Sequence, residues 1–181
     1  LTADLGAEGA GAAVVLRVGG RLRWQIDLHL PEGKTSGATD DIGFVERLLE
    51  PVGARDVIYS CGVGDPDPAE LPARLRALAQ APGSRIEVLF HDYLPISPSY
   101  TLTDGDGRHR GLPDPDRADS AHRARGRPLA HWQEAWGRLI AAAEAVTVFS
   151  RDSHRLVLAA YPQARGAIRL FIVEDSNEII L

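Results

Sequence analysis

A cluster of polar, titratable side chains follows directly after an apolar run near the middle of the sequence. His91, Asp92 and Tyr93 come immediately after residues 86–90, whose sequence Ile-Glu-Val-Leu-Phe is typical of a strand. In an open α/β sheet, ligands bind beyond the carboxyl ends of the strands, where backbone groups and helix N-termini converge. His91 is therefore the first candidate for a chemical role. The alternative is that His91 and Asp92 satisfy backbone groups of the loop while Tyr93 packs beneath it.

The elements that would position this cluster alternate between strands and helices. Helical spacing predicts helices that begin at Asp40 or Asp41, at a capping box from Asp67 to Glu70, at Pro128 and at Ser150. Strands separated by helices of about ten to fifteen residues imply right-handed crossovers. The predicted fold class is therefore α/β, a Rossmann-like, mostly parallel sheet with helices on both faces. Apolar runs and alternation predict its strands at 13–18, 22–30, 57–61, 86–90, 146–149 and 168–173.

The chain is predicted to form one domain. Residues 1–12 are rich in Gly and Ala without apolar periodicity, which predicts a flexible or linker-like N-terminus, and 13–181 form the single Rossmann-like domain. Because the chain opens on Leu1, has no methionine and ends on an apolar run, we expect a fragment of a longer enzyme. Residues 95–128 hold many Pro, Gly, Asp and Arg residues, and we expect this long loop to cover the site.

Composition limits the classes of partner. The 181 residues carry a formal net charge of -5 with interspersed charges, which argues against nucleic acid as a partner and against a polybasic membrane surface. A sugar or nucleotide-sugar ligand is compatible with this balance. The single cysteine, Cys61, ends an apolar run, which predicts a buried thiol in a reducing compartment. No apolar stretch approaches the roughly 20 residues that would span a bilayer, so a cytoplasmic location is expected.

Three other motifs have structural explanations at least as good as a chemical one. Residues 62–64 form Gly-Val-Gly after a strand, but the third glycine of a dinucleotide-binding fingerprint is missing. Asp104 and Asp106 could hold a divalent cation, although two successive Asp-Gly turns account for them equally well. Trp132 and Trp136 lie four residues apart on an apolar helical face, a spacing that favours core packing over a sugar-stacking surface. No metal or cofactor is predicted.

The order of these pieces resembles a known enzyme family. The resemblance covers roughly residues 55–165 and depends on the segment 86–100, the tryptophan helix and the run 145–153, Ala-Val-Thr-Val-Phe-Ser-Arg-Asp-Ser, with Arg-Gly-Leu-Pro at 110–113 between them. Together these segments resemble the N-terminal half of retaining glycosyltransferases of the GT-B type. The similarity is to bacterial family 4 enzymes that build O-antigen and other envelope polysaccharides, which carry a strand ending in His-Asp-Tyr and a later strand ending in a serine-containing helix cap.

The resemblance implies two Rossmann-like domains that face a cleft. The N-terminal domain would bind a glycan or lipid-linked acceptor, and the C-terminal domain, missing from this sequence, would bind the nucleotide-sugar donor, so the fragment alone is expected to be inactive. His91 and Asp92 would be the catalytic pair, His91 hydrogen-bonding the donor sugar at the cleft floor. The resemblance implies no metal and allows proximity to the inner face of the membrane. The substrate-binding residues that it implies are Tyr93, Ser97, Ser99, Tyr100 and Ser150.

Two other functions remain open at this point. The first is a non-catalytic α/β binding or regulatory module, in which the long loop recognises a protein or a glycan. The second is a metal-dependent transferase of the GT-A type, in which Asp104 and Asp106 hold a divalent cation.

Overall fold

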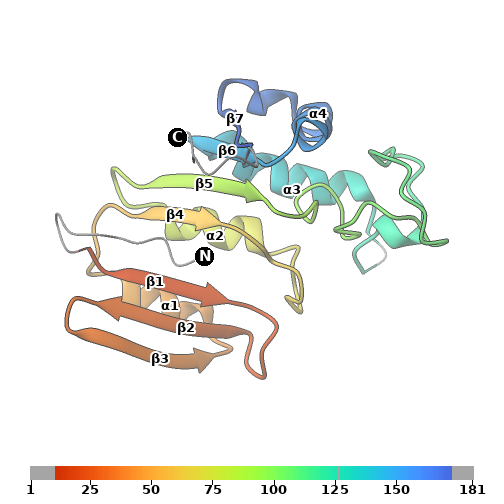
Figure 1. Cartoon of the computed structure of the whole chain (residues 1–181). Coiled ribbons are helices and arrows are strands. Elements are labelled where there is room, and N and C mark those ends of the chain that lie inside the picture. Colours follow the sequence, from red (N-terminus) through yellow and green to blue (C-terminus); the bar gives the residue numbers. More distant parts are fainter. Residues whose placement is uncertain (1–10, 126, 173–181) are drawn as a thin grey trace.

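A computed structural model describes residues 11–125 and 127–172, which form two sheets and a layer of helices (Figure 1). The first sheet is antiparallel and contains β1 (Ala13–Arg17), β2 (Trp24–Leu30) and β3 (Gly33–Thr39) in that order. The second contains β4 (Asp56–Tyr59), β5 (Arg85–Phe90), β6 (Ala145–Val148) and β7 (Ile168–Leu170). The α-helices are α1 (Ile42–Leu49), α2 (Leu71–Leu78), α3 (Leu129–Ala142) and α4 (Arg151–Ala160), and short 3-10 helices span Ser120–His122 and Pro162–Gly166.

The second sheet is wholly parallel, and its strands follow their order in the sequence. All three neighbouring pairs, β4 with β5, β5 with β6 and β6 with β7, are parallel. A helix lies in each connection, since α2, α3 and α4 separate the four strands in turn. The α/β class with parallel strands is therefore confirmed. The predicted single, mostly parallel sheet is corrected to two sheets, because β1 to β3 pair antiparallel with one another.

The helices cover one face of the parallel sheet. Along β5, Ile86, Val88 and Phe90 are buried in the core that includes residues of α2, α3 and α4. The alternate residues of β5 point to the other face and are exposed or half-buried. Helix α1 lies beside α2, and Figure 1 shows both behind the strands. Within residues 11–125 and 127–172, no helix covers the second face. The prediction of helices on both faces of the sheet is therefore corrected to helices on one face of the described structure.

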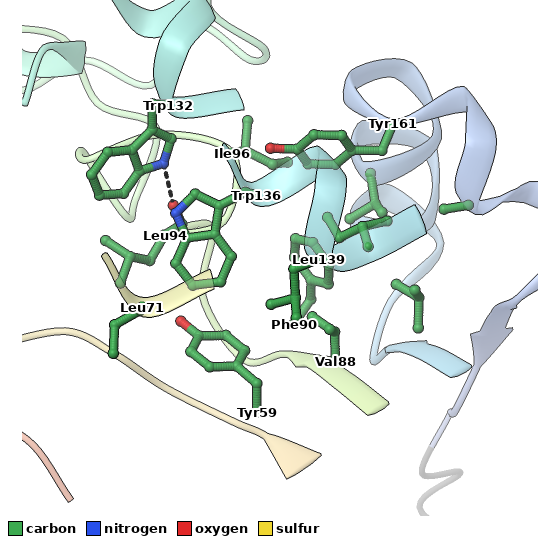
Figure 2. Close-up of a cluster of buried hydrophobic side chains, with 14 of the residues drawn as sticks. Tyr59, Leu71, Val88, Phe90, Leu94, Ile96, Trp132, Trp136, Leu139 and Tyr161 are labelled. Atoms are coloured by element: carbon green, nitrogen blue, oxygen red, sulfur yellow. Dashed lines mark hydrogen bonds between the residues drawn. The ribbon is translucent and has the colours of Figure 1, made fainter. Parts of the chain in front are cut away.

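Two tryptophans of α3 form the centre of the core (Figure 2). Trp136 is fully buried, and its ring meets the edge of the Tyr59 ring from β4 with 5.0 Å between centroids. Trp132 packs against Trp136 with 6.3 Å between centroids. Its Nε1 donates to the carbonyl of Leu94 over 2.8 Å, the dashed line of Figure 2. The tryptophan pair is therefore core packing, as its helical spacing predicts.

The loop between β5 and α3 is packed onto the helices. Besides the Trp132 bond to Leu94, the hydroxyl of Tyr161 donates to the carbonyl of Pro95, and both groups are buried. Ile96 and Leu102 are 0% and 1% exposed, so the loop has an apolar interior of its own. A loop anchored at its start by two buried hydrogen bonds is positioned by the fold.

Three further predictions need correction. The segment 33–39, where no strand was predicted, is the strand β3, which pairs along its whole length with β2. Helix α2 begins at Leu71, without a capping box: the Asp67 carboxylate pairs with Arg125 at 3.0 Å, and the Asp67 N–H donates to the Asp65 carboxylate at 2.6 Å. The Cys61 thiol is exposed rather than buried. Residues 1–10 and 173–181, which include most of the predicted flexible start and the end of the last predicted strand, lie outside the described residues.

No helix in the described part of the chain has the length and apolar character needed to cross a membrane.

Candidate functional site

The predicted polar cluster lies at the carboxyl edge of the parallel sheet. Since Phe90 pairs with Val148, the residues that follow, His91 and Phe149, leave neighbouring strands side by side. The His91 side chain is exposed, and its ring stacks on that of Phe149 with 4.5 Å between centroids and 14° between planes. The imidazole is therefore open to solvent on the edge where ligands of parallel sheets bind.

A second aromatic ring supports the first from the next strand. Phe171 follows β7, and its ring meets that of Phe149 nearly edge-on, with 6.2 Å between centroids and 80° between planes. His91, Phe149 and Phe171 thus form a row across the ends of β5, β6 and β7. We call these three residues the aromatic row.

Asp92 shapes the turn after His91. Its Oδ1 accepts a hydrogen bond of 2.8 Å from the backbone N–H of Leu94, an Asx turn that directs the chain into the packed loop. Desolvation of the Cys61 thiol, together with the nearby negative charge of Asp92, raises the pKa of that thiol. A thiol with a raised pKa stays protonated at neutral pH, which makes it a poor nucleophile.

Tyr93 connects the β5 loop to the start of α4. Its hydroxyl lies 2.9 Å from the Ser153 Oγ, and the Ser150 hydroxyl donates to the same Ser153 oxygen over 2.9 Å. Ser150 is also the N-cap of α4, since its Oγ accepts from the backbone N–H of Ser153 at 3.0 Å. The three hydroxyl groups form a chain beside the aromatic row, and Ser150 at its end is exposed.

Two of the expected substrate-binding serines point into the loop instead. Ser97 is 0% exposed, and its Oγ hydrogen-bonds the Nδ1 of buried His122 at 2.8 Å. The Ser99 hydroxyl donates to the carbonyl of Thr103 at 2.7 Å. Both hydroxyls hold the loop together, so we do not include Ser97 and Ser99 in the site. Tyr100 keeps an exposed ring, while its carbonyl accepts from the Tyr93 N–H at 2.8 Å.

The Asp104 carboxylate is occupied by the protein itself. It forms an ion pair with Arg110 and accepts from the backbone N–H groups of Asp106 and Arg108 at 3.1 and 2.8 Å. The Arg110 guanidinium holds the pKa of Asp104 below its usual range. Within the described residues, no group of three or more His, Cys, Asp or Glu side chains could hold a metal ion. A cation at Asp104 would have to displace Arg110.

The parallel sheet also carries a hollow that lies away from this edge. A shallow hollow of about 190 Å³ on the uncovered face is lined by Asp56, Arg85 and Glu87 near the amino ends of the strands. Asp56 and Arg85 already pair with each other there at 2.8 Å. We favour the carboxyl edge as the functional site, because the exposed His91 imidazole and the exposed Ser150 hydroxyl both follow the ends of adjacent strands there.

Sequence reasoning missed three residues of the site: Phe149, Phe171 and Ser153. Phe149 is the residue directly before the predicted cap Ser150, and strand register would place it beside His91. Ser153 lies three residues after the cap, where its backbone N–H is the one that an N-cap serine accepts. Strand register and the cap rule were the two signals that could have found these residues.

Comparison with known proteins gave no match: no family, no curated protein and no solved structure is significantly similar to this chain.

Proposed function

We propose that this chain is the acceptor-side domain of a GT-B type glycosyltransferase, which transfers a sugar from a nucleotide-sugar donor to a glycan or lipid-linked acceptor. The proposal is based on the resemblance over residues 55–165 and on one structural observation. That observation is the exposed imidazole of His91 at the carboxyl edge of a parallel sheet, next to Tyr93 and Ser150. A second domain outside these residues would bind the nucleotide, and the enzyme would work in the cytoplasm at the inner face of the membrane.

The proposed chemistry assigns one task to each group at the edge. The His91 imidazole hydrogen-bonds a hydroxyl of the donor sugar, and its fixed dipole faces the charge that develops as the bond to the nucleotide breaks. Asp92 sets the turn that presents the ring. The exposed hydroxyl of Ser150 and the ring of Tyr100 offer polar and flat apolar contacts to the acceptor.

The test uses the longer natural enzyme with a nucleotide-sugar donor. Replacing His91 with alanine is expected to lower kcat by about 100-fold or more, the loss typical of one preorganised donor. His131→Ala is the matched control, because His131 is an exposed histidine of α3 whose side chain takes no part in the proposed site. His131→Ala should keep the thermal midpoint of the wild type, and His91→Ala should lower it only slightly, by the loss of the stack with Phe149. Unchanged transfer by His91→Ala would reject the assignment.

The runner-up is a non-catalytic binding module that uses the loop 95–128. The packed interior of the loop favours it, because an ordered loop with an exposed Tyr100 can present a recognition surface. An assay of donor hydrolysis and transfer separates the two functions, since a pure binding module shows no turnover. The GT-A alternative makes a different prediction, loss of activity on chelation with EDTA. The ion pair of Asp104 with Arg110 disfavours this alternative, because Arg110 occupies the carboxylate that would bind the cation.

A further inference from the structure

Within the aromatic row, the His91 ring packs directly on the Phe149 ring. The two rings are close to parallel, at 14°, with 4.5 Å between centroids, so one face of the imidazole lies against Phe149. Phe149 in turn meets the nearly perpendicular ring of Phe171. The order of contacts is therefore Phe171, Phe149, His91, from the edge strand inward.

An exposed histidine at a strand end needs such a support if it is to act on a substrate. The second side-chain torsion of histidine is broad, so an exposed imidazole samples many orientations unless it is packed on one side. Catalytic groups must be held close to the productive geometry by residues whose own rotamers are fixed. Stacked aromatic pairs are favourable beyond the area that they bury, which gives Phe149 the means to fix the ring.

Phe149 lies outside the buried hydrophobic core. Its side chain is 37% exposed, in contrast to Val148, the preceding residue of β6, which is 0% exposed. An exposed phenylalanine in contact with a candidate catalytic ring is better explained by that contact than by core packing. The register of three adjacent strands keeps the row in place.

We propose that Phe149, supported by Phe171, is a positioning residue that fixes the orientation of the His91 imidazole. The inference rests on the proposed function for its kinetic consequence, but its geometric part concerns this chain alone. Phe149 touches the imidazole and acts on the reaction through it.

The first experiment measures the geometry by NMR on this chain. The ring current of Phe149 should shift the carbon-bound protons of the His91 ring upfield. Phe149→Leu keeps an apolar side chain without a ring current, and it should move these protons to positions typical of an unstacked histidine. Phe149→Tyr should leave them upfield. Phe44→Leu is the matched control, because Phe44 is an exposed phenylalanine of α1. Protons of His91 that do not move in Phe149→Leu would overturn the stacking.

The second experiment measures kcat and KM in the longer enzyme. Misplacement of a reacting group by about 1 Å can cost about 100-fold in rate, so Phe149→Leu is expected to lower kcat by about tenfold to 100-fold. KM for the acceptor should stay unchanged, since His91, through which Phe149 acts, contacts the donor sugar. Phe149→Tyr should restore kcat, which a role in packing alone does not explain, because leucine would then serve as well.

The outcomes distinguish the inference from the proposed function. If His91→Ala abolishes transfer while Phe149→Leu retains wild-type kcat, the function stands and the positioning role is overturned. If neither the wild type nor any variant transfers sugar, the proposed function fails, and the NMR result alone decides whether Phe149 orients the ring. A thermal midpoint for each variant checks that a lower kcat does not reflect unfolding.

Discussion

The hydrogen bond between Tyr93 and Ser153 should couple the β5 loop to α4, and a double-mutant cycle can measure that coupling. The two side chains are 60 residues apart in the sequence and 2.9 Å apart at their oxygens, and the pair is partly buried. Tyr93→Phe removes the hydroxyl while keeping the ring. Ser153→Ala removes the other partner while keeping the backbone N–H that the Ser150 cap accepts.

The expected magnitudes follow from these contacts. A hydrogen bond of this kind contributes about 0.5–1.5 kcal/mol to the free energy of unfolding, so each single variant should lose about 1 kcal/mol. Ser153→Ala also removes the acceptor of the Ser150 hydroxyl, so its loss should be the larger of the two. Residues in direct contact couple by at least about 0.5 kcal/mol, and the double variant should therefore lose less than the sum of the single losses.

Urea unfolding of the four proteins gives the coupling energy directly. A control cycle of Tyr93→Phe with Ser36→Ala should be additive, because Ser36 lies in β3 and bonds to Asp27 in the other sheet. Additive losses in the Tyr93 and Ser153 cycle would refute the reasoning that these hydroxyls form one connected chain at the sheet edge.

Two further predictions concern stability. Hydrogen bonds from Ser36, Arg17 and Lys34 hold the pKa of Asp27 below its usual range. The Asp27 carboxylate therefore adds to the free energy of unfolding at a pH above its unfolded pKa near 4, and this stabilisation is lost progressively as the pH falls below that value. The difference in unfolding free energy between wild type and Asp27→Asn should therefore shrink between pH 7 and pH 3, and a constant difference would contradict this. Ser97→Ala should lose about 1–3 kcal/mol by urea unfolding, because it leaves the buried Nδ1 of His122 without its partner.

Short-range sequence patterns correctly predicted the starts of α1 and α4 and the strands β5 and β6. The Asp41 cap of α1 and the Ser150 cap of α4 are both observed, each accepting a backbone N–H of the first turn. The apolar runs that became β5 and β6 were found within one residue of their observed bounds. These positions follow from short-range rules of capping and alternation.

Elements defined by distant partners could not be found in the same way. The strand β3, Gly-Lys-Thr-Ser-Gly-Ala-Thr, has almost no apolar character and is a strand because β2 offers it a ladder of hydrogen bonds. Asp67 has the type and spacing of a helix cap, but Arg125, 58 residues away, pairs with its carboxylate. In both cases tertiary contacts outweigh local propensity.

In the candidate site, too, some features follow from local sequence patterns and others depend on distant contacts. The position of His91 at the edge follows from the end of an apolar strand, which the sequence displays. The direction of Ser97 does not, because only the fold brings His122 to it from 25 residues away. The support by Phe149 depends on which strand lies next to β5, and that order is a property of the sheet.

The most direct test of the central claim is to map where sugars bind on this chain. The probes are the methyl glycosides of glucose, galactose, mannose and N-acetylglucosamine, added to isotope-labelled protein while backbone and ring resonances are followed. We expect the shifts to concentrate at His91, Tyr93 and Ser150, at the carboxyl edge of the parallel sheet. Shifts confined to the hollow near Asp56 and Arg85, or no shift at the carboxyl edge with any probe, would contradict this expectation.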